Sequence, residues 1–164
     1  MRTAALGEGT ELICPTCTSR RVVPLVYGVP SPLLHPLFLE RKIFPGGGMG
    51  RLLNKQAPTW KCLRCDAEWR GGLFAGGPGD SMDRAVLIRG IESTAVGIRV
   101  EKQYLTEQFG LSAETADPQP GWTFQEQRVF YLADRKIDVL DITLPDGSRR
   151  SVFFDITCFY GKVP

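Results

Sequence analysis

Alternation of apolar and polar residues is clearest in the last third of the chain. Three runs there, at 122–132, 137–144 and 151–159, are rich in β-branched and aromatic residues, which is typical of strands. Pro-Asp-Gly-Ser at 145–148 separates the second run from the third and favours a tight hairpin turn. Because short turns join antiparallel neighbours, the pattern predicts a three-stranded antiparallel meander.

A helix is predicted over 93–109, with Ser93 as its N-cap and Gly110 just beyond its last residue. Its apolar residues form two stripes on nearly opposite sides, one with Ile98, Leu105 and Phe109 and the other with Val96, Val100 and Tyr104. A surface helix shows only one such stripe. We therefore expect this helix to be sandwiched between the sheet and the N-terminal half, or to form a subunit contact. The segment at 111–121, with two prolines, is predicted to be a loop.

Shorter elements are predicted in the first half of the chain. Residues 22–27 are β-rich, but Pro24 cannot donate a ladder hydrogen bond, so we expect an edge strand or an irregular stretch. A Ser-Pro pair precedes a short predicted helix at 33–41. The glycine-rich residues 46–50 are expected to form a flexible loop. Residues 85–88 fit either a short buried strand or a helical turn.

Four of the five cysteines form two C-x-x-C pairs, Cys14 with Cys17 and Cys62 with Cys65. Each such turn holds two thiolates about one tetrahedral edge apart, and two turns complete a four-sulfur zinc site. The 44 residues between the pairs exceed the usual spacing, so they must fold as an insertion that returns to the metal. A redox C-x-x-C is the alternative, but two pairs in one half favour a closed, structural Zn2+ site.

The zinc-site pattern extends beyond the cysteines, with CPTC followed by YGVPS, a glycine run and PTWKCLRCDAEW. Over about residues 13–69 it resembles the N-terminal zinc-ribbon segment of uncharacterised bacterial proteins, which implies a zinc ribbon and no particular activity. Thr18 and Asp66 stand where those proteins have glycine, and Gly48 stands where they have a further cysteine. Since a left-handed backbone is unfavourable at a β-branched residue, we expect the turn around the first pair to be distorted.

These elements together predict an α+β fold, in which a zinc ribbon with a long insertion precedes a helix and a three-stranded antiparallel meander. We expect a zinc-ribbon domain at 1–72 with a helical insertion and an α+β domain at 80–164. Residues 71–79 contain five glycines and one proline, so we expect a loop or linker between the two domains.

Charge differs between the two halves, although the 164 residues carry a net charge of only +2. Residues 1–79 hold ten Lys and Arg against five Asp and Glu, whereas residues 80–164 hold ten against thirteen. The basic half therefore permits contact with phosphates, although binding domains usually show a clustered basic face. The candidate phosphate-contacting residues are Arg20, Arg21, Arg41, Lys42, Arg51 and Lys55.

Composition limits the class of protein further. Apolar residues make up 43% of the chain and charged residues 23%, as in an ordinary globular protein. The sequence contains neither a run of 18 apolar residues nor a secretory signal, so we expect a cytoplasmic protein without a membrane partner. The expected partner is a protein or a nucleic acid, and a homo-oligomer is possible.

Carboxylates in the predicted sheet suggest the competing hypothesis, a metal-dependent hydrolase or nuclease. Asp138, Asp141 and Asp155 fall on adjacent predicted strands, where clustered carboxylates could hold Mg2+. However, Asp138 and Asp141 should point to opposite faces of one strand. Thr157 stands where a nuclease-like pattern would have lysine. The lone Cys158 is expected to be a small buried residue. A non-enzymatic binding protein is therefore the leading hypothesis.

Overall fold

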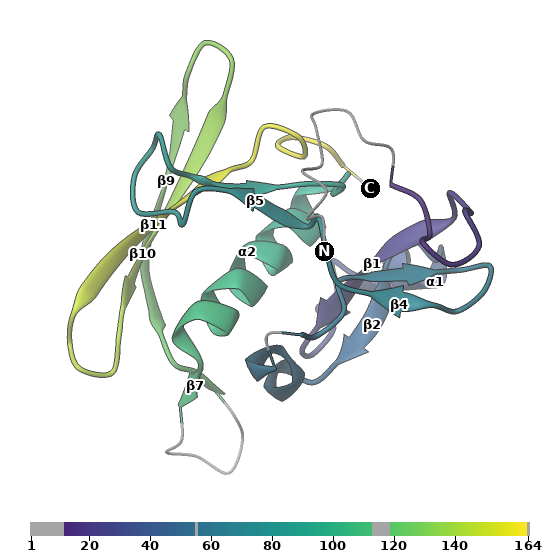
Figure 1. Ribbon diagram of the computed structural model, residues 1–164. Helices are drawn as coiled ribbons and strands as arrows, with labels where there is room; N and C mark the ends of the chain where they lie inside the picture. Colours follow the sequence, from purple (N-terminus) through teal and green to yellow (C-terminus); the bar gives the residue numbers. More distant parts are fainter. Residues whose placement is uncertain (1–11, 55, 113–118, 164) are drawn as a thin grey trace, which may run out of the picture.

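The computed structural model describes residues 12–54, 56–112 and 119–163 and shows a four-stranded and a five-stranded β-sheet with a long helix between them (Figure 1). The first half contains β1 (Val22–Tyr27), α1 (His35–Leu39), β2 (Phe44–Gly47), the 3-10 helix η1 (Met49–Leu53), β3 (Trp60–Cys62) and β4 (Glu68–Trp69). The second half contains β5 (Phe74–Gly76), β6 (Val86–Ile88), α2 (Thr94–Phe109), β7 (Leu111–Ser112), β8 (Gln119–Pro120), β9 (Thr123–Tyr131), β10 (Lys136–Thr143) and β11 (Arg149–Asp155). The chain is therefore a mixed α and β protein.

β1 is an inner strand of the first sheet, so the predicted edge position is wrong, whereas the alternative of an irregular stretch agrees with the register shift between Val26 and Tyr27. The sheet has the order β2-β1-β3-β4, and β1 runs antiparallel to β3 and parallel to β2. Pro24 lies opposite Trp60 of β3, whereas the pairing with β2 begins one residue later, at Leu25. The N–H of Leu25 points to the β3 side, where it donates to Thr59. The missing N–H of Pro24 therefore faces the side on which β2 has not yet begun.

The glycine-rich residues 46–50 do not form the predicted flexible loop. They contribute the end of β2 and the start of η1. A Cβ atom at Gly46 would come within 2.6 Å of the ring of Tyr27, which is itself buried and donates its hydroxyl to the carbonyl of Pro58. Glycine at this position leaves room for the tyrosine ring against β2. Gly46 is therefore explained by close packing and not by flexibility.

Two other predicted segments differ in extent from the observed ones. The helix predicted at 33–41 is α1, only five residues long, with Pro36 in its first turn, where proline is tolerated. The segment predicted as a loop at 111–121 begins with β7 and nearly ends with β8, and these two short strands pair antiparallel. The middle of that segment, residues 113–118, lies outside the described residues.

The second sheet has the order β5-β6-β11-β10-β9. The three predicted strand runs correspond to β9, β10 and β11, and both pairings among them are antiparallel. Of residues 85–88, the last three form the strand β6, which runs parallel to β11. The glycine-rich segment 71–79, predicted as a loop or linker, contains the edge strand β5. The sheet is thus mixed and two strands wider than the predicted meander.

α2 lies between the two sheets, which accounts for its two apolar stripes (Figure 1). Val100 and Leu105 are fully buried, whereas Ile98 of the same helix is 42% exposed. On one side, Tyr104 makes an edge-on contact with the ring of Phe154 in β11. On the other, the buried Gln103 side chain accepts a hydrogen bond from the backbone N–H of Tyr27 in β1. Of the two alternatives, the sandwiched helix is the one observed here, and the subunit contact stays a prediction.

One buried apolar cluster draws on both halves of the chain. Val26 and Trp60 from the first sheet belong to it together with Val100 of α2 and Phe154 of the second sheet. The side chains of the two predicted domains, 1–72 and 80–164, therefore share a core. The division into two domains stays a prediction, and the shared core weighs against it.

Candidate metal centre

The pairing of β1 with β3 brings the two C-x-x-C turns together. Cys14 and Cys17 lie in the turn before β1, and Cys62, the last residue of β3, lies opposite Val22 of β1. Cys65 follows in the turn that leads to β4. The insertion between the pairs thus returns the chain to its starting point, as the cysteine spacing predicted.

All four sulfur atoms lie within 4.8 Å of one another. The Sγ atoms of Cys14 and Cys65 are 3.6 Å apart, and so are those of Cys17 and Cys62. Four sulfurs bound to one zinc ion at about 2.3 Å lie about 3.8 Å from each other. The cluster therefore has the size of a tetrahedral four-thiolate metal site, and the four sulfurs are too far apart to be disulfide-bonded as they stand.

The two turns have the same backbone hydrogen bonds. In the first turn the N–H of Thr18 donates to the carbonyl of Cys14 at 3.0 Å, and in the second the N–H of Asp66 donates to that of Cys62 at 3.0 Å. The second residue after each leading cysteine directs its N–H to that sulfur, at 3.4 Å in both cases. This repetition gives two equivalent half-sites, each preorganised by its own backbone.

Thr18 and Asp66 both adopt the left-handed conformation, with φ of 59° and 60°. The distortion expected for the first turn is therefore absent, and the expectation was wrong. Thr18 adopts the unfavourable backbone conformation itself, so the turn keeps its hydrogen bonds. Its hydroxyl donates to the carbonyl of Cys17 at 2.7 Å. A non-glycine residue in this region costs of order 1–3 kcal/mol, and the β-branched side chain makes Thr18 the less favourable of the two.

Replacing Thr18 with glycine should stabilise the protein by about 1 kcal/mol, because the turn already has the backbone conformation that glycine adopts freely. Thermal unfolding of the metal-loaded protein measures this as a rise in Tm of roughly 2–4 °C. Asp66→Gly is the matched control: aspartate tolerates the left-handed region, and the change also removes an ion pair with Lys61, so the gain should be smaller. A lower Tm for Thr18→Gly than for the parent protein would contradict this account.

The four thiols cannot all ionise together without a cation. At Cys62 burial opposes ionisation, but backbone N–H groups and neighbouring thiols outweigh it and lower the pKa to about 6. At Cys65 the backbone of Ala67 favours the thiolate, but burial and the other three thiols outweigh it and raise the pKa to about 12. A divalent cation at the centre would remove this repulsion, because metal-bound thiols are deprotonated. The donor set therefore fits Zn2+.

The candidate phosphate-contacting residues do not form one surface. Arg51 donates to the carbonyl of Gly46 and pairs with Glu68, whereas Arg21 is exposed next to the first turn. Three of them, Arg20, Arg41 and Lys42, line a cavity beside β1. Lys55 lies outside the described residues.

The carboxylates of the competing hydrolase hypothesis do not converge. In the β10–β11 register Asp138 lies opposite Phe154 and Asp155 lies opposite Ile137, so the two carboxylates occupy opposite faces of the sheet. Asp141 is engaged by Arg128 and by Ser151. Within residues 12–54, 56–112 and 119–163, the four cysteines are the only group of three or more metal-ligating side chains.

Asp138 instead forms a buried acid pair with Glu101 of α2, which the sequence did not reveal. Both residues are 2% exposed, and Gln127 of β9 donates to Asp138. Burial raises the pKa of Glu101 well above its usual range, and the charge of Asp138 and a hydrogen bond to it raise that pKa further. Burial also raises the pKa of Asp138. Burial therefore favours the protonated, uncharged form of Glu101 beside Asp138.

Replacing Glu101 with glutamine should stabilise the protein at pH 8 by at least about 1 kcal/mol and have little effect at pH 4. A group whose folded-state pKa is raised contributes stability below its unfolded pKa, and that contribution is lost as the pH rises toward the folded value. Glutamine donates the same hydrogen bond without a titrating proton. Urea unfolding at both pH values measures the difference.

Glu107→Gln supplies the matched control on the same helix. Glu107 is buried and accepts from Arg70 at 3.0 Å, so its neutralisation should destabilise the protein at pH 8. An equal loss of stability in both variants would show that the acid pair needs its negative charges, contrary to the assignment above.

No protein-family model, curated protein or solved structure matches the chain. In the described part of the chain, no helix combines the length and apolar character needed to cross a membrane.

Proposed function

We propose that this chain is a non-enzymatic zinc-binding protein, with one structural Zn2+ held by Cys14, Cys17, Cys62 and Cys65. The observation that carries the proposal is the closed set of four sulfurs at tetrahedral spacing. Catalytic zinc sites keep an open position for water or substrate, whereas four thiolates fill the coordination shell. The zinc would supply folding free energy and no chemistry of its own.

The zinc-ribbon character of the first half belongs to the same proposal. The antiparallel β1–β3–β4 pairings and the two equivalent turns support it, with α1, β2 and η1 as the insertion. Reduced thiols are also characteristic of the cytoplasm, which is the compartment we propose.

Metal analysis of the protein purified without added metal tests the site. We expect one zinc per chain, with all four thiols protected from alkylation until a chelator is added. Metal-free protein with a disulfide in either C-x-x-C pair would instead support the redox alternative.

We further propose that the ribbon is a binding module, for which nucleic acid is the favoured partner. The exposed Arg20 and Arg21 follow the first turn, and the exposed Arg64 lies within the second. Cations at one end of a rigid, metal-held unit are suited to phosphate contacts, which carry most of non-specific affinity. The folded zinc turns would position these side chains.

A gel-shift titration at low salt tests this role with Arg21→Ala and, as a control of equal charge, Arg150→Ala on β11. We expect Arg21→Ala to weaken binding about equally for all sequences, and the log–log salt slope to be roughly −0.7 to −0.9 per phosphate neutralised. The absence of any shift at micromolar protein would rule out nucleic acid and leave a protein partner. Metal-dependent cleavage would overturn the non-enzymatic proposal.

A further inference from the structure

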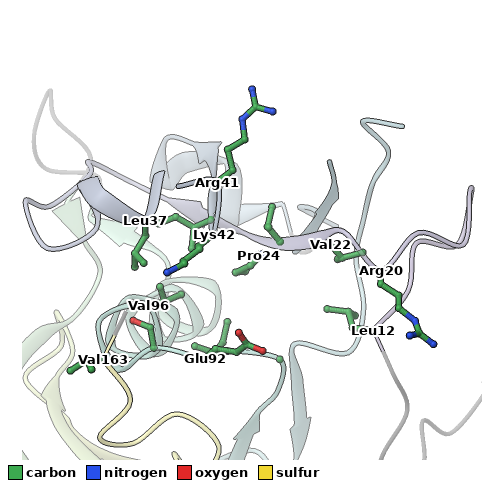
Figure 2. Close-up of a pocket in the computed structure, with 15 residues that line it drawn as sticks. Leu12, Arg20, Val22, Pro24, Leu37, Arg41, Lys42, Glu92, Val96 and Val163 are labelled. Carbon is green, nitrogen blue, oxygen red and sulfur yellow. The ribbon is translucent and has the colours of Figure 1, made fainter. Parts of the chain in front are cut away.

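A cavity of about 520 Å³ lies where the first sheet meets the start of α2 (Figure 2). Its size falls within the range of small-molecule sites. The walls come from β1, from the segment that follows α1 and from the loop that enters α2. Most of the lining side chains are apolar, among them Val22, Pro24, Leu37, Ile43, Ile91 and Val96.

One end of this cavity is formed by the N-terminus of α2. The first i→i−4 hydrogen bond of the helix runs from the N–H of Gly97 to the carbonyl of Ser93, and Thr94 donates to Lys162 instead. The amides of Ala95 and Val96 thus belong to the first turn, which has no intrahelical acceptors and carries a partial positive charge. Such a helix end favours an anion.

Ser93 supplies a second and independent indication. It lines the cavity, is only 6% exposed, and its buried Oγ has no hydrogen-bond partner in the described part of the chain. The predicted N-cap therefore occupies the right position, but its side chain does not cap the helix. A buried hydroxyl without a partner is unfavourable, and a ligand that reaches the helix end would supply the missing hydrogen bond to this oxygen.

The charges around the cavity favour the same kind of ligand. Among the described residues that line it, Arg20, Arg41 and Lys42 are basic and Glu92 is acidic. Figure 2 shows the Lys42 side chain extending toward the first turn of α2, next to Val96, whereas the guanidinium of Arg41 points away. Lys42 also pairs with Glu40 at 2.7 Å on an exposed surface, where a ligand anion can compete for it.

We propose that this cavity binds a small organic carboxylate with an apolar body. The carboxylate lies at the first turn of α2, between the Ser93 hydroxyl and the Lys42 ammonium, and the body packs against Val22, Leu37 and Ile43. The apolar walls distinguish this ligand from inorganic phosphate or a nucleotide, whose polar surface they would leave unsatisfied.

Titration of the zinc-loaded full chain with octanoate, followed by calorimetry and by amide NMR, tests the inference. We expect saturable octanoate binding with shifts at Ala95 and Val96, and at least tenfold weaker binding of both acetate and octan-1-ol. Equal affinity for octan-1-ol would show that the charge is not recognised. Tighter binding of acetate or inorganic phosphate would show that the apolar walls are not used. Either result would overturn the proposal.

Two variants locate the head group. Ser93→Ala normally destabilises a helix, but here the hydroxyl makes no capping bond, so the variant should unfold like the parent protein while losing roughly tenfold in octanoate affinity. Lys42→Met should lower the affinity similarly. Lys102→Met, an exposed change of the same charge on α2 away from the cavity, should leave it unaltered. Unchanged affinity in both Ser93→Ala and Lys42→Met would refute the assignment.

Discussion

Replacing Cys62 with serine should abolish zinc binding and unfold the first sheet before the second. A structural zinc ion contributes on the order of 10 kcal/mol in small zinc modules, comparable to the whole stability of a domain. Cys62 is the last residue of β3, and both β1 and β4 pair with that strand. Amide hydrogen exchange should therefore show lost protection across β1, β3 and β4, with protection retained longest in β10 and β11.

Cys158→Ser is the matched control for this experiment. Cys158 lies outside the cluster and donates its thiol to the carbonyl of Ile88 at 2.9 Å, a bond that a serine hydroxyl can also make. The control should keep one zinc per chain and near-parental exchange. If Cys62→Ser retained a full equivalent of zinc with normal protection, the metal centre would have to be assigned elsewhere.

Replacing Gly97 with alanine should destabilise the protein by about 3 kcal/mol, although alanine is normally favoured over glycine in a helix by about 1 kcal/mol. A Cβ atom at Gly97 would come within 2.1 Å of the ring of Phe159, which is fully buried beside α2. The ring belongs to the large buried cluster, so it cannot move without disturbing the side chains packed around it. Denaturant unfolding measures the loss as a lower midpoint at unchanged slope.

Two further variants separate the steric cause from a propensity effect. Gly50→Ala lies in η1 with no atom within 4 Å of the new Cβ, so its stability should change by less than about 0.5 kcal/mol. Combining Gly97→Ala with Phe159→Leu should recover part of the loss, because the smaller side chain leaves room for the methyl group. A stabilised single Gly97→Ala variant would rule out the close contact.

The features predicted well from sequence are those with local signals. Alternating residues and the turn at 145–148 indicate β9, β10 and β11, because each pairing joins neighbours in the chain. The four-cysteine cluster follows from spacing alone, since each C-x-x-C turn is a local structure. Zinc as the ion, and the ribbon as a binding module, stay proposals.

The features that sequence reasoning missed depend on distant partners. The inner position of β1 is possible only because β2 starts one residue beyond Pro24. The parallel pairing of β6 with β11 joins segments about 70 residues apart, and no short-range pattern signals it. No short-range pattern pairs Glu101 with Asp138, because Glu101 lies on α2 and Asp138 on β10, and the two meet only when the helix packs on the second sheet.

β11 is the central strand of the second sheet and the last strand of that sheet to be synthesised. During synthesis both C-x-x-C turns have left the ribosome once residue 65 has, so the metal can close the first sheet early. β6 cannot pair fully with its neighbour β11 until Asp155 has been added to the growing chain. Through that interval the β6 edge is unpaired, and such an edge is open to pairing with other nascent chains. Early zinc loading would shorten the stretch of unfolded chain during this interval, so zinc-starved cells should accumulate this protein as aggregate.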